Sequence, residues 1–163
     1  MGNLRTFIAG AIAAGVLIVG AHGAHAVEVS ESATFKASAD EVWQIVNEFG
    51  GLHEWHPWFV ATTVSNEDGG LRRLIVTGDG GWAYESLDDY SWAGKSMTYT
   101  VLESVFPIAN YSATLKVSES GGGATINWSS KFDAAGMSDE DAAKLIADAY
   151  QAGFDSIKAM TGE

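Results

Sequence analysis

Glu85 is the side chain best placed for acid–base chemistry in this sequence. It lies in a β-rich segment, where Ala83 and Leu87 share its strand face. A carboxylate inside an apolar pocket has a raised pKa, and it can then donate a proton or anchor a polar ligand group. The alternative is a structural ion pair with Arg72 or Arg73 at the mouth of a cavity. Glu85 and Arg72 are therefore candidate ligand contacts.

His56 is the second candidate, because it stands between Trp55 and Pro57 where a short helix meets a strand. An imidazole titrates near neutral pH, so it could hydrogen-bond a ligand or transfer a proton. The alternative is structural, with a ring nitrogen bonded to a backbone carbonyl. His53 and a nearby carboxylate could complete a metal site with His56. The sequence offers neither a His-Glu-x-x-His motif nor more distant ligands, so we predict no metal and no other cofactor.

Three tyrosines, Tyr99, Tyr111 and Tyr150, are the hydroxyl groups expected inside the fold. A tyrosine combines apolar surface with a polar tip, which suits a site that orients a mostly apolar ligand. The alternative is that these rings only fill the core. Trp128 and Phe154 are further candidate contacts, although such side chains also serve packing. No residue is predicted to be catalytic, since there is no cysteine and no serine in a nucleophile motif.

The acidic composition narrows the class of partner. The chain has 21 Asp and Glu against nine Lys and Arg, and a formal net charge of −12. Nucleic acids and anionic membrane surfaces attract basic patches, so neither is expected as a partner. A basic protein partner remains compatible with this charge.

The first 26 residues have the layout of a secretory signal. Arg5 precedes an apolar run from Phe7 to Gly20, and Ala24-His25-Ala26 matches the small-x-small cleavage pattern. We predict cleavage near Ala26, a periplasmic or secreted location, and no stable membrane insertion afterwards. The alternative is a retained anchor, but polar and small residues weaken its last third. Residues 27–163 would then form one domain.

Hydrophobic periodicity predicts the elements that position the candidates. Val27 to Phe35 alternates as a strand, and Ser38-Ala-Asp-Glu41 is a capping box that starts a short helix. Leu52 to Trp55 forms one further turn. Six β-rich segments then follow at spacings typical of an antiparallel meander: Phe59–Val64, Leu71–Thr77, Trp82–Leu87, Ser96–Glu103, Asn110–Val117 and Ala124–Phe132.

The last segment is a long amphipathic helix. Ser138 is its N-cap, and an apolar stripe runs to Met160. The predicted fold is α+β: a curved seven-stranded antiparallel sheet around this helix, with short helices after the first strand. We expect the helix to form most of the apolar wall of a cavity. Gly153, in its stripe, either leaves room for ligand or allows close packing.

Several separated motifs resemble the SRPBCC superfamily of START and Bet v 1-like domains, which have a helix-grip fold. They occur in order over residues 27–163: Ala39-Asp-Glu-Val-Trp43, Phe49-Gly50, Trp55-His-Pro57, Arg72-Arg-Leu74, Glu85-Ser-Leu87 and Asn110-Tyr111. The resemblance implies that Glu85 faces a pocket and that His56 lies at its rim. Phe132-Asp-Ala-Ala-Gly136 and Tyr150-Gln-Ala-Gly-Phe154 are similar to the periplasmic MxaD-like branch.

We therefore predict an exported, non-catalytic protein that binds a small apolar ligand carrying one or two polar groups. The MxaD resemblance implies an alternative, an accessory factor for a periplasmic (methanol-type) dehydrogenase and its cytochrome. A further alternative is a polyketide cyclase- or dehydratase-like enzyme with Glu85 and His56 as its acid–base pair.

Overall fold

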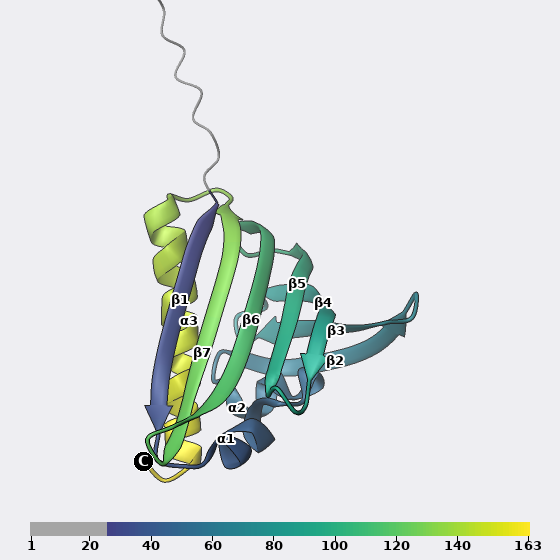
Figure 1. Ribbon diagram of the computed structural model, residues 1–163. Coiled ribbons are helices and arrows are strands. Elements are labelled where there is room, and N and C mark those ends of the chain that lie inside the picture. Colours follow the sequence, from purple (N-terminus) through teal and green to yellow (C-terminus); the bar gives the residue numbers. More distant parts are fainter. Residues whose placement is uncertain (1–25) are drawn as a thin grey trace, which may run out of the picture.

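A single antiparallel sheet organises the protein in the computed structural model, which describes residues 26–163 (Figure 1). Its seven strands have the order β1-β7-β6-β5-β4-β3-β2, so strands β2 to β7 form a meander and β1 pairs with the last strand. This confirms the predicted sheet. The strands are β1 (Val27–Phe35), β2 (Phe59–Glu67), β3 (Gly70–Thr77), β4 (Trp82–Ser91), β5 (Ser96–Ser104), β6 (Ile108–Ser120) and β7 (Gly123–Ala134).

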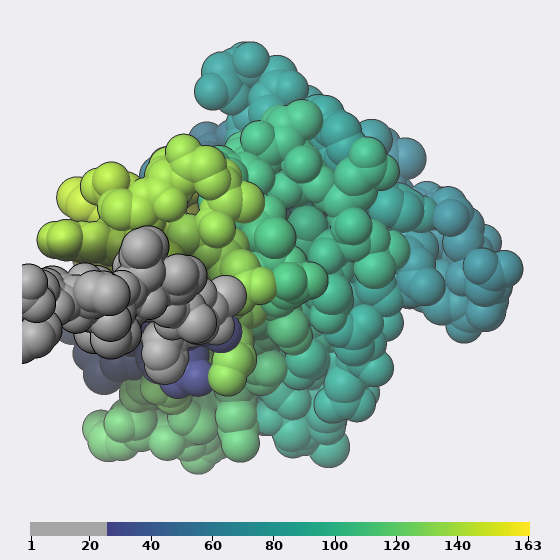
Figure 2. All heavy atoms as spheres, turned by 90° about the horizontal axis from the view of Figure 1, so that it is seen from above, coloured from purple at the N-terminus to yellow at the C-terminus, as the bar shows by residue number. Residues whose placement is uncertain are grey.

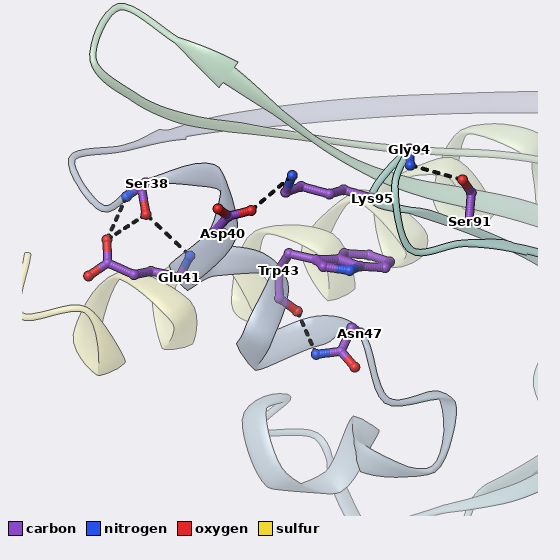
Figure 3. A network of polar contacts seen from close by, with 8 residues as sticks. All are labelled: Ser38, Asp40, Glu41, Trp43, Asn47, Ser91, Gly94 and Lys95. Carbon is purple, nitrogen blue, oxygen red and sulfur yellow. Dashed lines mark hydrogen bonds and ion pairs between the residues drawn. The ribbon is translucent and has the colours of Figure 1, made fainter.

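The connection between β1 and β2 folds as short helices. These are α1 (Ala39–Val46), a 3₁₀ turn η1 (Phe49–Gly51) and α2 (Leu52–Trp55). The predicted capping box is confirmed: the Glu41 N–H donates to Ser38 Oγ at 3.3 Å, and the Ser38 N–H donates to the Glu41 carboxylate at 2.8 Å (Figure 3). Both otherwise unpaired donors at the helix start are thereby satisfied.

The turn between β4 and β5 is held against α1. Lys95 Nζ lies 2.9 Å from the Asp40 carboxylate (Figure 3). The Trp43 ring, which is almost fully buried, packs near Tyr90 and Trp92. The helical connection therefore closes one end of the space under the sheet.

The long helix α3 (Asp139–Met160) lies along the β1 and β7 edge of the sheet (Figure 1). Ser138 Oγ accepts the Asp141 N–H at 3.1 Å, which confirms the predicted N-cap. The buried positions follow the predicted stripe: Ala142, Ile146, Tyr150, Gly153, Phe154 and Ile157. Within residues 26–163, none of the helices combines the length and apolar character needed to cross a bilayer.

Irregular pairing interrupts the regular ladder of the sheet. The β4–β5 register shifts between Tyr84 and Glu85, and the β6–β7 register shifts between Ala109 and Ser112. Asn110, inside the second shift, has a φ of 52°. Such bulges increase local twist and redirect side chains. The β2–β3 hairpin projects beyond the rest of the molecule (Figures 1 and 2).

Candidate functional site

A cavity of about 80 Å³ lies between the inner face of the sheet and α3. The structure brings six of the predicted site residues together around it: His56, Glu85, Tyr99, Tyr111, Trp128 and Tyr150. The remaining wall is apolar. Ile146 and Ala149 come from the helix stripe that was predicted to line the cavity, and the strand and loop residues were not predicted as wall: Phe59, Ile75, Ala83, Val101, Phe106 and Ile108. The site is therefore an apolar chamber with a few polar groups.

A second cavity of about 100 Å³ adjoins the first. Trp58, Thr77 and Leu145 belong to its wall alone. The two cavities have the following lining residues in common: Phe59, Phe106, Ile108, Ile146 and Ala149. Because these side chains form a shared partition, a modest rearrangement of one of them would join the two spaces. We call the first the inner cavity and the second the outer cavity.

Glu85 forms a buried ion pair with Arg73. Arg73 Nε lies 2.5 Å from a Glu85 carboxylate oxygen, and Nη1 donates to the Phe49 carbonyl at 2.8 Å. The guanidinium also lies over the rings of Phe49 and Tyr99, 4.2 and 4.9 Å from their centroids. Burial raises the pKa of Glu85, and the neighbouring guanidinium opposes that rise. Glu85 is thus both an ion-pair partner and part of the cavity wall.

Arg72, the predicted ligand contact, is on the other face of the strand. Its Nη1 donates to Ser86 Oγ at 2.5 Å, and it does not line either cavity. Successive strand residues point to opposite faces, so only one of two adjacent arginines can face inward. The β3–β4 hairpin could have identified the arginine that faces inward. A turn centred on Asp79 places Arg73 directly opposite Glu85.

His56 is fixed by hydrogen bonds at both ring nitrogens. The Trp58 N–H donates to Nδ1 at 3.3 Å, so the proton lies on Nε2, which is 2.9 Å from the Ala149 carbonyl oxygen. Burial is the main cause that lowers the pKa of His56 to about 4, and Arg73 contributes in the same direction. The ring is therefore neutral at physiological pH and ties α2 to α3. This is the structural role that the sequence left as an alternative.

The tyrosine and tryptophan side chains form a buried hydrogen-bonded group. Trp128 Nε1 donates to the Tyr99 hydroxyl at 2.9 Å, and the Tyr111 and Tyr150 hydroxyls lie 2.6 Å apart. Trp128 stacks on Tyr150 with ring centroids 4.3 Å apart. Burial raises the pKa of all three tyrosines, that of Tyr150 to about 12. Their hydroxyls remain protonated and serve as hydrogen-bond donors.

The helix contributes less of the cavity than the sequence predicted. Its lining residues are Leu145, Ile146, Ala149 and Tyr150, and the strands supply most of the wall. Phe154, a predicted contact, is fully buried against Trp128 and lines neither cavity.

Gly153 is a site of close packing. A Cβ at that position would lie 3.1 Å from His56 and Trp55 and 3.2 Å from Trp128. These three rings leave no room for a ligand at Gly153.

Metal-ligating side chains do not gather into a cluster in the described part of the chain. Among residues 26–163, no three His, Asp or Glu side chains converge in a way suited to a metal ion.

Comparisons with known proteins agree with this architecture. A sequence model of the family described as polyketide cyclase / dehydrase and lipid transport matches residues 26–161. No curated protein matches the chain. The solved structure of XoxI from Bacillus cereus is 26% identical, covers 82% of this chain and 94% of its own, and has a TM-score of 0.77.

Two further solved structures share the fold. An uncharacterized protein from Bacillus thuringiensis is 25% identical with a TM-score of 0.78, over 83% of this chain and 99% of its own. The Zhui aromatase/cyclase from Streptomyces sp. R1128 is 15% identical with a TM-score of 0.70, over 83% of this chain and 93% of its own. At that identity the likeness shows the fold alone, since one scaffold serves many functions.

Proposed function

The chain belongs to the polyketide cyclase/dehydrase and lipid transport family, and from this premise we propose that it is an exported binding protein for a small apolar ligand with one or two polar groups. One observation carries the proposal: the predicted polar residues and an apolar wall enclose the same cavity. Ligand sites are commonly apolar chambers in which a few polar groups set the orientation. Glu85 and the tyrosine hydroxyls would be those groups here.

Export is the second part of the proposal. Its support is the signal-like sequence of residues 1–26, of which residues 1–25 lie outside the described residues. The described domain starts directly afterwards, with β1 at Val27. The mature protein would therefore begin at the first strand and act in the periplasm or outside the cell.

An accessory role is the second candidate function, and the volumes of the cavities favour it. Known ligand pockets have volumes of about 300–1,000 Å³, whereas these cavities have about 80 and 100 Å³. The outer cavity also has an exposed apolar side chain in its wall, Trp58, and two further exposed apolar residues, Val60 and Val105, adjoin its lining residues Phe59 and Phe106 in the sequence. An MxaD-like accessory protein would use such a surface to contact a periplasmic dehydrogenase or its cytochrome.

An acid–base mechanism with Glu85 and His56 has less support from the geometry. Both nitrogens of His56 have protein partners, and Glu85 is paired with Arg73. A proton transfer to ligand would first break one of these contacts. We therefore do not include catalysis in the proposed function.

The test is native mass spectrometry of protein exported by a bacterial host that expresses the full chain. We expect the intact mass of a chain cleaved after Ala26, together with a retained or added apolar small molecule. Ala149→Phe should fill the partition between the two cavities and abolish retention. Ala159→Phe, at an exposed position of the same helix, is the matched control and should retain ligand.

Two results would contradict the proposal. A product that keeps residues 1–26 in the membrane fraction would exclude the exported, soluble form. Equal retention by the Ala149→Phe and Ala159→Phe variants would mean that any bound molecule lies outside these cavities. Stable capture of a dehydrogenase or cytochrome without ligand would favour the accessory role instead.

A further inference from the structure

Within the described residues, not every hydroxyl proton around the inner cavity has an acceptor from the protein. The Tyr99 oxygen accepts the Trp128 indole proton, and within residues 26–163 the Tyr99 proton has no acceptor of its own. In the Tyr111–Tyr150 pair only one hydroxyl can donate to the other. The second proton of that pair has Ser130 Oγ beside it, an oxygen with no other hydrogen-bond partner in the described chain. The Tyr99 O–H is therefore an available donor at the inner cavity, and the Tyr111–Tyr150 pair supplies a second one when its proton turns from Ser130 to a ligand.

These donors belong to neighbouring rings in the wall of the inner cavity. The Tyr99 and Tyr111 ring centroids are 6.4 Å apart, and both rings line the inner cavity together with Tyr150. Burial keeps all three phenols protonated by raising the pKa of each. A carbonyl oxygen has two lone pairs and can accept two hydrogen bonds. It is the simplest single group that would satisfy both protons.

The charges at the cavity favour a neutral ligand. Among the described residues, Glu85 is the only carboxylate in the wall of either cavity, and Arg73 balances its charge. The Arg73 guanidinium is itself held by Glu85 and the Phe49 carbonyl. Burying a charged group without a partner is strongly unfavourable. In the part of the chain that the structure describes, neither wall offers an anionic ligand a free cation, and His56 is neutral.

The volumes limit the ligand to roughly one ring. A cavity of about 150 Å³ in another protein binds benzene. The inner cavity alone, at about 80 Å³, is smaller, but the adjoining outer cavity adds about 100 Å³ once the partition moves. The ring would occupy the apolar partition near Ile146 and Ala149, with its polar group directed to the tyrosines.

We propose that the inner cavity selects a neutral, ring-sized molecule that places a carbonyl oxygen against the hydroxyls of Tyr99 and the Tyr111–Tyr150 pair. This inference rests on the proposed function, because it specifies the ligand class of the same cavity. It also assigns the specificity to hydrogen-bond donors rather than to charge.

The test compares three probes of similar shape on protein purified after expression of the full chain. Acetophenone carries the carbonyl, α-methylstyrene replaces it with a CH₂ group, and benzoate is anionic. Titrations are followed by the ¹H–¹⁵N signal of the Trp128 indole, whose N–H contacts Tyr99 at the cavity. We expect acetophenone to bind about tenfold more tightly than α-methylstyrene, as two modest hydrogen bonds imply. Benzoate should bind more weakly than either.

Two tyrosine variants test which hydroxyl groups donate hydrogen bonds to the ligand. Tyr99→Phe removes one free O–H and should reduce the preference for acetophenone by about threefold or more. Tyr111→Phe removes one hydroxyl of the pair but leaves Tyr150 with a free proton, so the preference should persist. If Tyr99→Phe fails to fold, the comparison of probes on the unaltered protein still decides the matter.

The outcomes separate the ligand class from the proposed function. Equal affinities for acetophenone and α-methylstyrene, with the Trp128 signal shifted by both, would overturn the carbonyl inference and leave an apolar binding protein. Tighter binding of benzoate would overturn neutrality. If no probe shifts the Trp128 signal, neither the ligand class nor ligand binding at this cavity stands.

Discussion

The two halves of the contact between α3 and the sheet are packed differently, although they belong to the same helix stripe. Around Gly153, the rings of Trp55, His56 and Trp128 approach so closely that a single Cβ would touch all three. One turn earlier, Ala149 lines both cavities. A small residue therefore has a different structural role at each of these two positions. At Gly153 the missing side chain allows large rings to pack closely, whereas at Ala149 the small side chain leaves the cavities unfilled.

This difference separates the stabilising part of the core from the part available to a ligand. The packed half includes Phe154 and Ile157, both fully buried, and burial of such side chains contributes about 1.5–3 kcal/mol each. The other half, around Ala149, lines the cavities, and we call it the hollow half. It gains less stabilisation from apolar burial, and Glu85 in its wall is paired with Arg73. A domain can maintain an unfilled space beside a core that is packed firmly elsewhere.

The largest expected effect tests the charged wall of the hollow half. Arg73→Met removes the partner of a carboxylate that is almost fully buried. We expect the free energy of unfolding at neutral pH to fall by about 3–5 kcal/mol, because an uncompensated buried charge remains. Urea denaturation measures this change.

The double variant Arg73→Met/Glu85→Gln is the control, since it removes both charges and should recover much of the loss. In the single variant, Glu85 should have its pKa raised further by the loss of the cation. A raised carboxyl pKa favours the folded state below the unfolded pKa and loses that contribution as pH rises. The single variant should therefore regain stability on acidification. Equal stabilities of Arg73→Met and the unaltered protein would mean that this wall tolerates a free charge.

His56 lies where the two halves meet, and its protonation should lower the free energy of unfolding of the domain. Its pKa is about 4 when folded, against 6.5 as the ordinary value. A lowered pKa gives stability above pH 6.5 that is progressively lost as pH falls to 4, by a total of about 3 kcal/mol. The difference in unfolding free energy between pH 7 and pH 4.5 should therefore be larger in the unaltered protein than in His56→Gln. Identical pH profiles would show that His56 is solvated or flexible in solution.

Much of the fold could be predicted from the sequence, because its determinants are local. The capping box at Ser38 and the alternation of apolar residues in each strand depend on neighbours within a few positions. The hairpin turns then set the sheet order. The structure confirms these elements, with most strand ends extended by a few residues.

The site was harder to predict, because it depends on distant contacts and on register. A shift of one residue separates Arg72, on the outer face, from Arg73, in the buried pair. The role of Gly153 depends on rings contributed by α2 and β7, far away in the sequence. Cavity volume depends on how all these side chains interlock, which no single periodicity reveals.

Equal substitutions at the two small helix positions test the contrast between the halves directly. Gly153→Leu should overpack the ring cluster and lower the free energy of unfolding by about 1–3 kcal/mol. Ala149→Leu should extend into the cavities and leave stability unchanged or slightly higher, while it weakens ligand binding. Thermal melts and denaturant titrations of both variants measure the difference. Similar losses in the two variants would mean that the halves are equally packed.

The smallest expected effect concerns the tyrosine pair, which joins the packed half to the hollow one. Tyr150 stacks on Trp128 in the packed half, and its hydroxyl meets that of Tyr111 in the wall of the inner cavity. Tyr111→Phe keeps the ring and removes one hydrogen bond, so it should lower the free energy of unfolding by about 0.5–1.5 kcal/mol. Tyr90→Phe, at an exposed ring on β4, is the control and should change stability by less.

The size of the Tyr111 effect also tells whether the inner cavity admits water. If water reaches the stranded Tyr150 hydroxyl, it replaces the lost partner, and the cost falls to the lower end of that range. If the cavity is dry, the unpaired hydroxyl remains desolvated, and the cost reaches or exceeds the upper end. A carbonyl probe added to the variant should then restore stability in the dry case, because its oxygen accepts the free proton. A loss that no probe reduces would place the Tyr150 hydroxyl in the packed half, out of reach of a ligand.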